Sequence, residues 1–324
     1  MTAAPLFMVT NRGRSNNGLN DRRVATLSYF TADATCPNAR ILANWQEIKQ
    51  AAFEKAIVQL ASQFPLLSDD QNRDQKHVSL FVHGYNNTWD DGAERYAQIK
   101  RDLFDAKDLG VLVLFTWPSD GTPADYLPDR EDARDSGPQV ADLFVRLHDV
   151  VVAAQRLAVK NSDPDRFCRA KVSVIAHSMG NYVIEKALAV ASKRLNSPQL
   201  ITLVHQLAMV AADVDNDLFE KDKPVDSDGA LMANLCYRIA ALYTGLDDVL
   251  GASAGLKHFG KRRLGRSGLD DRDDVWDNVF DADVSKLIDT SKAIHSAVFD
   301  SPKAMDLLES ILRGVDRHQL PLTP

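Results

Sequence analysis

Short apolar runs alternate along the chain with longer stretches in which apolar residues recur every three or four positions. This alternation predicts strands of a parallel sheet joined by crossover helices. We expect strands at residues 6–10, 25–30, 78–82, 111–116, 171–176, 200–211, 237–243 and 275–280. We expect helices at residues 45–64, 89–104, 141–159, 181–194 and 302–313. Because the strand runs are apolar nearly throughout, helices should cover both faces of a mostly parallel central sheet.

Two segments interrupt this pattern. Residues 119–138 contain Gly121, Pro123, Pro128 and many charges, which predicts a loop. Residues 251–272 are rich in glycine and basic side chains, which predicts a long, solvated surface loop. A chain of 324 residues is within the range of one large α/β domain. We therefore expect a single domain over residues 1–324, with loop or cap-like insertions near 119–138 and 251–272.

Composition narrows the class of partner. The formal net charge of −7 argues against nucleic acid, because phosphate binding needs a basic face. The three cysteines are scattered and lack the spacing of metal ligands, which is typical of a reducing compartment. The first residues lack a signal-peptide pattern, and no apolar run approaches the ~20 residues that span a bilayer. We expect a cytoplasmic protein without a membrane span, and its oligomeric state is left open.

Residues 176–180 (Ala-His-Ser-Met-Gly) are similar to the G-x-S-x-G motif that presents a nucleophilic serine. The motif needs a strand before it and a helix after it, and both are predicted at this place. A sharp strand-to-helix turn would hold Ser178 in a strained conformation at the N-terminus of the helix. The alternative is that Ser178 only caps that helix. The strand–turn–helix context favours the nucleophile.

A second motif, His83-Gly84, follows the predicted strand 78–82. A His-Gly pair at this point of a hydrolase sheet precedes one of the two backbone N–H groups that bind an oxyanion. We expect these donors to be the N–H groups of Tyr85 and Met179, because the second comes from the residue after the nucleophile. The alternative for His83-Gly84 alone is an ordinary turn before a helix cap, for which Asn87 or Thr88 is suited.

Side chains that line the substrate are expected above the carboxyl ends of the strands. Our candidates are four aromatic or imidazole side chains: His83, Trp117, Tyr126 and His177. The basic side chains Arg130 and Arg134, and the basic stretch 257–266, are weaker candidates. The alternative is that Trp117 belongs to the core and that the charges are solvated.

A serine nucleophile needs a base, and the base needs an acid that orients it. Of the three downstream histidines, His258 lies before the last predicted strand and His318 lies near the chain end, so we favour His295. The acid should follow the strand 237–243, where Asp247 stands next to Asp248. Asp213, after the preceding strand, is a rival. We favour Asp247, then Asp213, then Asp248.

Four segments together resemble the bacterial α/β-hydrolases of unknown function grouped as DUF900. They are residues 81–87 (Phe-Val-His-Gly-Tyr-Asn-Asn), residues 115–121 (Phe-Thr-Trp-Pro-Ser-Asp-Gly), residues 176–181, and the region from Tyr243 to Gly265. The resemblance covers roughly residues 7–308. It implies the α/β-hydrolase fold and a Ser178–Asp247–His295 triad, and it implies no particular substrate.

The function expected on these grounds is hydrolysis of a carboxylic ester, or of a thioester or amide, in a small molecule. The reaction would pass through an acyl-enzyme on Ser178, with neither a metal nor an organic cofactor. The alternative is a catalytically inactive α/β-hydrolase scaffold that binds a ligand or a protein.

Overall fold

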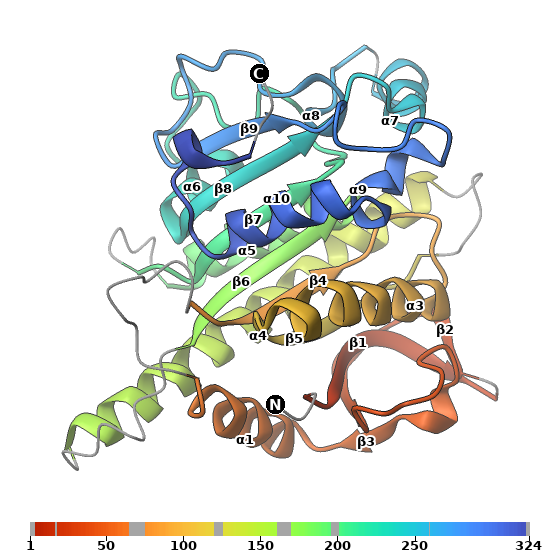
Figure 1. Cartoon of the computed structure of the whole chain (residues 1–324), viewed down its shortest axis with the longest axis vertical. Coiled ribbons are helices and arrows are strands. Elements are labelled where there is room, and N and C mark those ends of the chain that lie inside the picture. The colour runs from red at the N-terminus through yellow and green to blue at the C-terminus, as the bar shows by residue number, and fades with distance from the viewer. Residues whose placement is uncertain are drawn as a thin grey trace.

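The computed structural model describes residues 4–16, 18–64, 75–119, 126–160, 170–195, 201–258 and 260–321. These residues form a sheet of nine strands in the order β3-β2-β1-β5-β4-β6-β7-β8-β9 (Figure 1). The strands are β1 (Leu6–Ser15), β2 (Gly18–Ala32), β3 (Gln46–Ile48), β4 (His77–Val82), β5 (Gly110–Thr116), β6 (Lys171–His177), β7 (Val204–Val210), β8 (Cys236–Tyr243) and β9 (Val279–Asp283). Only the pairs β1–β2 and β2–β3 are antiparallel. The other six pairs are parallel, which confirms the mostly parallel sheet.

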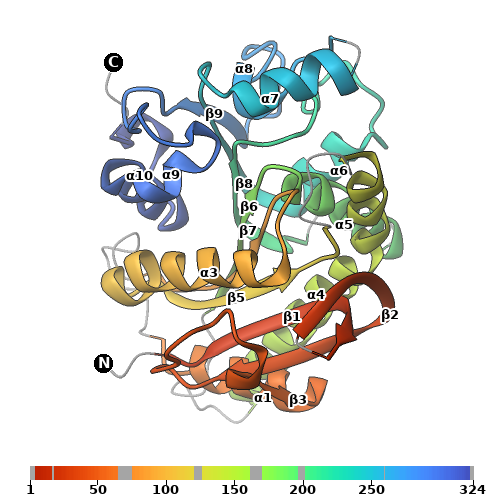
Figure 2. The ribbon, with the colours of Figure 1, turned by 90° about the vertical axis from the view of Figure 1, so that its right-hand side faces the viewer.

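Helices cover both faces of the sheet, as predicted (Figure 2). They are α1 (Gln50–Ala61), α3 (Trp89–Ile99), α4 (Tyr126–Lys160), α5 (Gly180–Arg194), α6 (Asp228–Leu235), α7 (Asp248–Ala252), α8 (Leu264–Ser267), α9 (Ala297–Asp300) and α10 (Pro302–Leu312). The side chains of β4 alternate between two apolar cores. Leu80 and Val82 pack with α1, α4 and α5, whereas Phe81 packs with α3, α9 and α10.

The predicted strand 25–30 begins earlier, at Gly18 of β2, and two further elements also differ from the structure at their starts. The predicted helix 45–64 begins instead with β3, an edge strand that pairs with β2, and the helix α1 starts only at Gln50. The predicted strand 275–280 is shifted, because Val275 forms an isolated bridge with Glu220 and β9 begins at Val279. Both errors come from pairing with a distant segment, which the local pattern does not encode.

The predicted loop 119–138 is wrong for the part that the structure describes, because α4 begins at Tyr126 and continues to Lys160. Pro128 lies in the first turn, where a backbone N–H has no partner within the helix, so proline costs little there. Pro138 lies inside the helix and removes one hydrogen bond. The buried side chains of Ala133, Val140 and Ala141 flank it and anchor the helix against the sheet.

The predicted surface loop 251–272 is wrong in part. Residues 251–257 and 264–267 form the end of α7, a π-helical turn (Ser253–Lys257) and α8, whereas residues 258, 260–262 and 268–272 form neither helix nor strand, as predicted. Arg263 in this stretch is fully buried. Its guanidinium donates to the carboxylates of Asp213 and Asp215, which follow β7. A buried arginine needs such partners, and they lie about fifty residues away in the sequence. The neighbouring side chains of Lys261 and Arg262 are exposed, as predicted.

One phenol joins α3 to the middle of the sheet. The Tyr96 hydroxyl accepts a hydrogen bond from the N–H of Phe7 in β1 at 2.9 Å. It donates to the carbonyl of Leu112 in β5 at 3.1 Å. Tyr96 is fully buried, so water replaces neither bond. Because α3 follows the segment that carries His83 and Gly84, this contact helps to fix that segment against the sheet.

We predict that Tyr96→Phe lowers the free energy of unfolding by about 1–3 kcal/mol, because it leaves a buried N–H and a buried carbonyl without partners. Urea unfolding followed by tryptophan fluorescence measures the change. Tyr29→Phe is the matched control, since Tyr29 is also a buried residue but its hydroxyl makes no hydrogen bond to the described residues, and it should cost less. Equal losses in the two variants would contradict the prediction.

Candidate active site

The predicted catalytic residues all follow the carboxyl ends of neighbouring strands. Ser178 comes directly after β6, Asp213 follows β7 and Asp247 follows β8. His295 lies in a short 3-10 turn (Ile294–Ser296) after β9. Strands β6 to β9 are adjacent and parallel, so their carboxyl ends meet along one edge of the sheet. Ligands of such sheets bind at this edge.

The turn between β6 and α5 is strained at Ser178, whose φ angle is +52°. A non-glycine residue in this left-handed region is uncommon and costs about 1–3 kcal/mol. Surrounding hydrogen bonds hold it there. The Ser178 N–H donates to the carbonyl of Val210 at 3.0 Å. The buried amide of Asn181 donates to the carbonyls of Ala176 at 3.0 Å and Ser178 at 3.1 Å.

The ends of β4 and β6 approach so closely that only glycine fits at two positions. A Cβ atom on Gly180 would lie 2.5 Å from the carbonyl oxygen of His83, and one on Gly84 would lie 2.7 Å from the Ser178 Cβ. The backbone after His83 therefore passes directly beside the serine. Within the described residues, the Met179 N–H at the start of α5 has no hydrogen-bond acceptor. Of the two predicted oxyanion donors, Met179 follows Ser178 directly in the sequence, and Tyr85 follows Gly84, which lies against Ser178.

Asp247 and His295 are paired. The Nδ1 atom of His295 lies 2.7 Å from Oδ2 of Asp247, which is fully buried. The other carboxylate oxygen, Oδ1, accepts the N–H of Leu250 at 3.0 Å and caps α7. With its proton on Nδ1, a neutral His295 has a lone pair on Nε2. The structure describes no hydrogen bond from His295 to the Ser178 hydroxyl, and such bonds often tighten only when substrate binds.

The rival acids lie in other environments. The Asp248 side chain is 96% exposed and lies near Arg266. Asp213 is buried and accepts hydrogen bonds from Tyr126 at 2.7 Å, Ser253 at 3.0 Å and Arg263 at 2.8 Å. Burial alone would raise the pKa of Asp213, but the attraction of Arg263 and the Tyr126 hydroxyl hold that pKa below its usual range. Asp213 is therefore an ionised partner of Arg263, with both oxygens in use.

All four predicted substrate contacts are buried, and Trp117 and Tyr126 support other groups. Trp117 stacks on His83, and its indole N–H donates to the His83 carbonyl at 2.9 Å. The Tyr126 hydroxyl lies between Asp213 and His258, 2.6 Å from the Nε2 atom of the latter. His177 contacts the predicted base, because its Nε2 lies 2.9 Å from the His295 carbonyl.

A polar cavity of about 480 Å³ opens next to these residues. Its lining includes His83, His177 and Ser296, the neighbour of His295. The remaining lining comes from β4, from the segment after Gly84 and from α3: Phe81, Asn86, Asn87, Asp91, Glu94, Arg95 and Gln98. This cavity places space for a polar group beside the predicted catalytic residues.

The model of the family "Alpha/beta hydrolase of unknown function (DUF900)" matches residues 61–315. The chain belongs to DUF900. This family member is 24% identical over 258 residues to an uncharacterized protein of Nostoc sp., alr1448, and the match covers 67% of the chain. The same match covers 56% of the Nostoc protein, so the chain spans about half the length of that relative. An esterase of Pyrobaculum calidifontis is a solved structure with 13% identity and a TM-score of 0.36, matched over 82% of this chain and 91% of the esterase chain. At that score the likeness carries no argument about the site.

Several residues that shape the site of this DUF900 protein were not predicted as site residues. Asn181, Arg263 and Ser253 hold the backbone or the carboxylate next to Ser178. The available signal was a polar side chain at a position where the helix or strand pattern demands an apolar one. Asn181 is such a case, because this polar side chain lies in the first turn of α5 at a position that is fully buried.

No group of three or more His, Cys, Asp or Glu side chains suited to a metal ion occurs in the part of the chain that is described. The helices of that part include none with the length and apolar character needed to cross a membrane.

Two histidines beside Ser178 are kept neutral. Burial, and secondly the charge of Arg12, lower the pKa of His83 to about 3. Burial, and secondly the proximity of His295, lower the pKa of His177 to about 3. At the far end of the sheet, burial and the nearby Lys171 lower the pKa of His205 to about 4. In the folded DUF900 domain these histidines thus stay unprotonated at pH values below ~6.5, at which the unfolded chain is protonated at the same residues.

We predict that the free energy of unfolding falls as the pH is lowered from 6.5 toward 4. In this window the unfolded chain binds more protons, so each such histidine contributes a loss of up to about 1.4 kcal/mol per pH unit. Urea unfolding at several pH values measures the slope. His205→Gln should reduce the slope, because it removes one of the histidines whose pKa the fold lowers, and His205 lies away from the active site. The control His318→Gln replaces an exposed histidine and should leave the slope unchanged. A flat profile in the wild-type protein would contradict this prediction.

Proposed function

We propose that this chain is a serine hydrolase that cleaves a carboxylic ester, or a thioester or amide, of a small molecule through an acyl-enzyme. The observation that carries the proposal is the strained backbone of Ser178 at the same sheet edge as the His295–Asp247 pair. A strained turn between a strand and a helix exposes the serine hydroxyl above the edge of the sheet, where a substrate can reach it. Membership of an alpha/beta hydrolase family supports the same reaction class.

In the proposed mechanism, the Ser178 oxygen attacks the substrate carbonyl while Nε2 of His295 takes the hydroxyl proton. The negative charge that develops on the carbonyl oxygen is bound by the N–H groups of Tyr85 and Met179. His295 then gives its proton to the leaving alcohol, thiol or amine. Water, deprotonated by the same imidazole, attacks the acyl group and releases the acid and free Ser178.

We assign the acid role to Asp247. Its Oδ2 atom contacts His295 Nδ1, so it fixes the imidazole tautomer and stabilises the imidazolium that forms when Ser178 loses its proton. The cap of α7 orients the carboxylate before any substrate binds, since Oδ1 is bonded to Leu250. Asp213 already serves Arg263 and Tyr126, which supports the choice of Asp247.

Ser178→Ala is expected to abolish turnover of p-nitrophenyl acetate and labelling by a fluorophosphonate probe, while circular dichroism and the unfolding midpoint stay close to wild type. The reason is that both reactions need the serine oxygen as nucleophile. Ser291→Ala, which removes an exposed serine, is the control and should react normally. Undiminished turnover in Ser178→Ala would exclude the proposed function, and an unlabelled wild-type protein would favour the inactive scaffold.

Asp247→Asn should lower kcat by about 10³–10⁴, because the amide no longer stabilises the charged imidazole. The neighbouring Asp248→Asn changes an exposed carboxylate of the same size and should leave kcat within a factor of two or so. Initial rates over a range of ester concentrations measure both. A larger loss in Asp248→Asn than in Asp247→Asn would overturn the assignment of the acid.

A further inference from the structure

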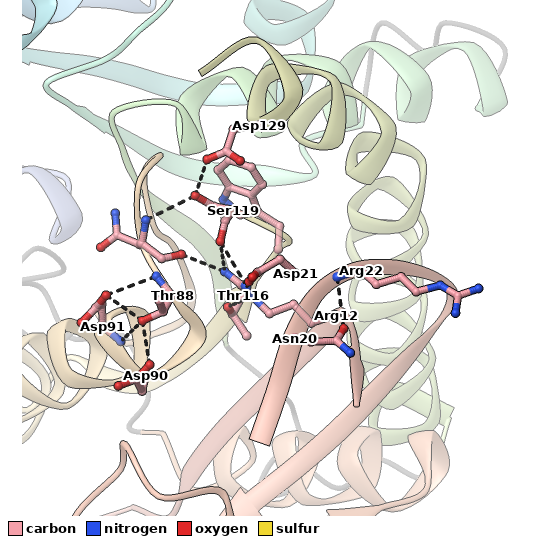
Figure 3. Close-up of polar contacts among 12 residues, drawn as sticks. Arg12, Asn20, Asp21, Arg22, Thr88, Asp90, Asp91, Thr116, Ser119 and Asp129 are labelled. Atoms are coloured by element: carbon pink, nitrogen blue, oxygen red, sulfur yellow. Dashed lines mark hydrogen bonds and ion pairs between the residues drawn. The ribbon is translucent and has the colours of Figure 1, made fainter. Parts of the chain in front are cut away.

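Arg12 in β1 carries a positive charge into the sheet beside the predicted oxyanion loop, which we define as residues 83–88. Its guanidinium is fully buried and forms an ion pair with Asp21 at 2.6 Å. It also donates to the carbonyl of Asn87 at 2.9 Å and to the hydroxyl of Thr116 at 3.0 Å. Figure 3 shows Arg12 between Asp21, Thr116 and the loop after β5, which contains Ser119. A buried charge is costly unless its partners are fixed, so these contacts define one arrangement.

The second side of the oxyanion loop is held by a carboxylate. Asp129 of α4 is buried and accepts the hydroxyl proton of Ser119 at 2.6 Å. The Ser119 oxygen in turn accepts the N–H of Asn87 at 3.2 Å. The loop is therefore held by a cation, Arg12, which binds the Asn87 carbonyl, and by an anion, Asp129, which acts through Ser119 on the Asn87 N–H.

The hydrogen bonds from Arg12 have only one consistent direction. Arginine only donates, so the Thr116 oxygen accepts from Arg12 Nε. The Trp117 backbone N–H points at His83 Nε2, 3.3 Å away, which is therefore an acceptor, so the Thr116 hydroxyl proton lies on its 2.9 Å contact with that atom. A neutral imidazole with an accepting Nε2 carries its proton on Nδ1. That Nδ1–H donates to the Gly84 carbonyl, 2.8 Å away.

The Gly84 carbonyl belongs to the peptide unit whose N–H is that of Tyr85. It accepts a second hydrogen bond from the Asn87 amide at 3.2 Å. Donors on a peptide carbonyl polarise the peptide unit and make its N–H a stronger donor, by about 10–30% for each bond in a chain of hydrogen bonds. The positive charge of Arg12, at the start of this chain of hydrogen bonds, acts in the same direction. It draws electron density of the Gly84–Tyr85 peptide toward the Gly84 carbonyl oxygen.

We propose that Arg12 is a positioning residue of the oxyanion hole, which acts through Thr116 and His83 to orient and polarise the Gly84–Tyr85 peptide. The proposal rests on the proposed function, in which the Tyr85 N–H binds the oxyanion. The relay, defined as Arg12, Thr116 and His83, touches neither the substrate nor Ser178 in this scheme. It strengthens a donor that the reaction uses mainly in the transition state.

The relay holds its direction over the working pH range. Burial and the charge of Arg12 lower the pKa of His83 to about 3, so the imidazole remains neutral near pH 7. A protonated His83 would donate from Nε2 as well, and its contact with the Thr116 hydroxyl would reverse.

Thr116→Val tests the relay with less damage than a substitution of the buried Arg12. It removes the hydroxyl between Arg12 and His83 and keeps the shape of the side chain. Thr10→Val is the matched control, because Thr10 is the cross-strand partner of Thr116. Its buried hydroxyl donates to the Thr116 carbonyl and accepts the Arg12 backbone N–H, so this variant removes hydrogen bonds to the backbone of the same two residues and leaves the side-chain relay intact. Thr116→Ser keeps the hydroxyl and should retain the wild-type hydrolysis rate. We expect kcat/KM for p-nitrophenyl acetate to fall about tenfold in Thr116→Val, with KM little changed, and to stay near wild type in the other two.

A spectroscopic measurement tests the relay without any need for activity. Tyr85 is the only one of seven tyrosines that follows a glycine, so ¹³C-carbonyl glycine with ¹⁵N-tyrosine labelling isolates a single Gly84–Tyr85 amide signal. We expect its proton to shift upfield in Thr116→Val and to move less in Thr10→Val and Thr116→Ser. In wild-type protein, ¹⁵N-histidine spectra should show the Nδ1–H tautomer for His83.

Three results would overturn the proposal: an Nε2–H tautomer at His83, an unmoved Tyr85 amide in Thr116→Val, or equal activity in Thr116→Val and Thr10→Val. The tautomer decides the matter on the wild-type protein if Thr116→Val does not fold. Failure of the proposed function is a separate result, since it appears as undiminished hydrolysis in Ser178→Ala and leaves the tautomer and amide shifts unaffected.

Discussion

The close approach of two backbones, between the end of β4 and the turn after β6, constrains the rest of the site. Gly84 lies against Ser178, and Gly180 lies against the carbonyls of Val82 and His83. A side chain at either glycine would push the two strands apart and relax the turn. The left-handed conformation of Ser178 therefore depends on parallel pairing of β4 with β6 as much as on its own neighbours in the sequence. The strain is maintained by tertiary structure, as expected where a conformation costs energy locally.

Two buried arginines lie on either side of this backbone approach, and each forms an ion pair with a carboxylate. Arg12 pairs with Asp21 on one side, and Arg263 pairs with Asp213 on the other. The first lies next to the oxyanion loop and the second next to the backbone of Ser178, whose carbonyl accepts the N–H of Asp213. The guanidinium is buried in both pairs, and removing the partner of a buried charge is costly, so these pairs specify a single arrangement of the loops.

The sequence predicted what depends on local pattern. The strands before Ser178 and His83 and the helix after Ser178 follow from apolar runs and periodicity, and they were predicted within a few residues. The choice of Asp247 as first candidate rested on chain order, and the structure places that carboxylate against His295. What failed was long-range in origin. The burial of Arg263 depends on acids fifty residues earlier, and the helical state of residues 126–138 depends on packing that outweighs two prolines and a glycine.

Asp247 divides its two oxygens between a helix and a histidine. The helix that it caps, α7, has five residues and is too short to be stable without its neighbours. Its formation and the orientation of the imidazole are therefore one cooperative unit, because the same carboxylate must be in place for both. Local unfolding of α7 would release the His295 ring at the same moment, so the orientation of this ring is only as long-lived as one short helical turn.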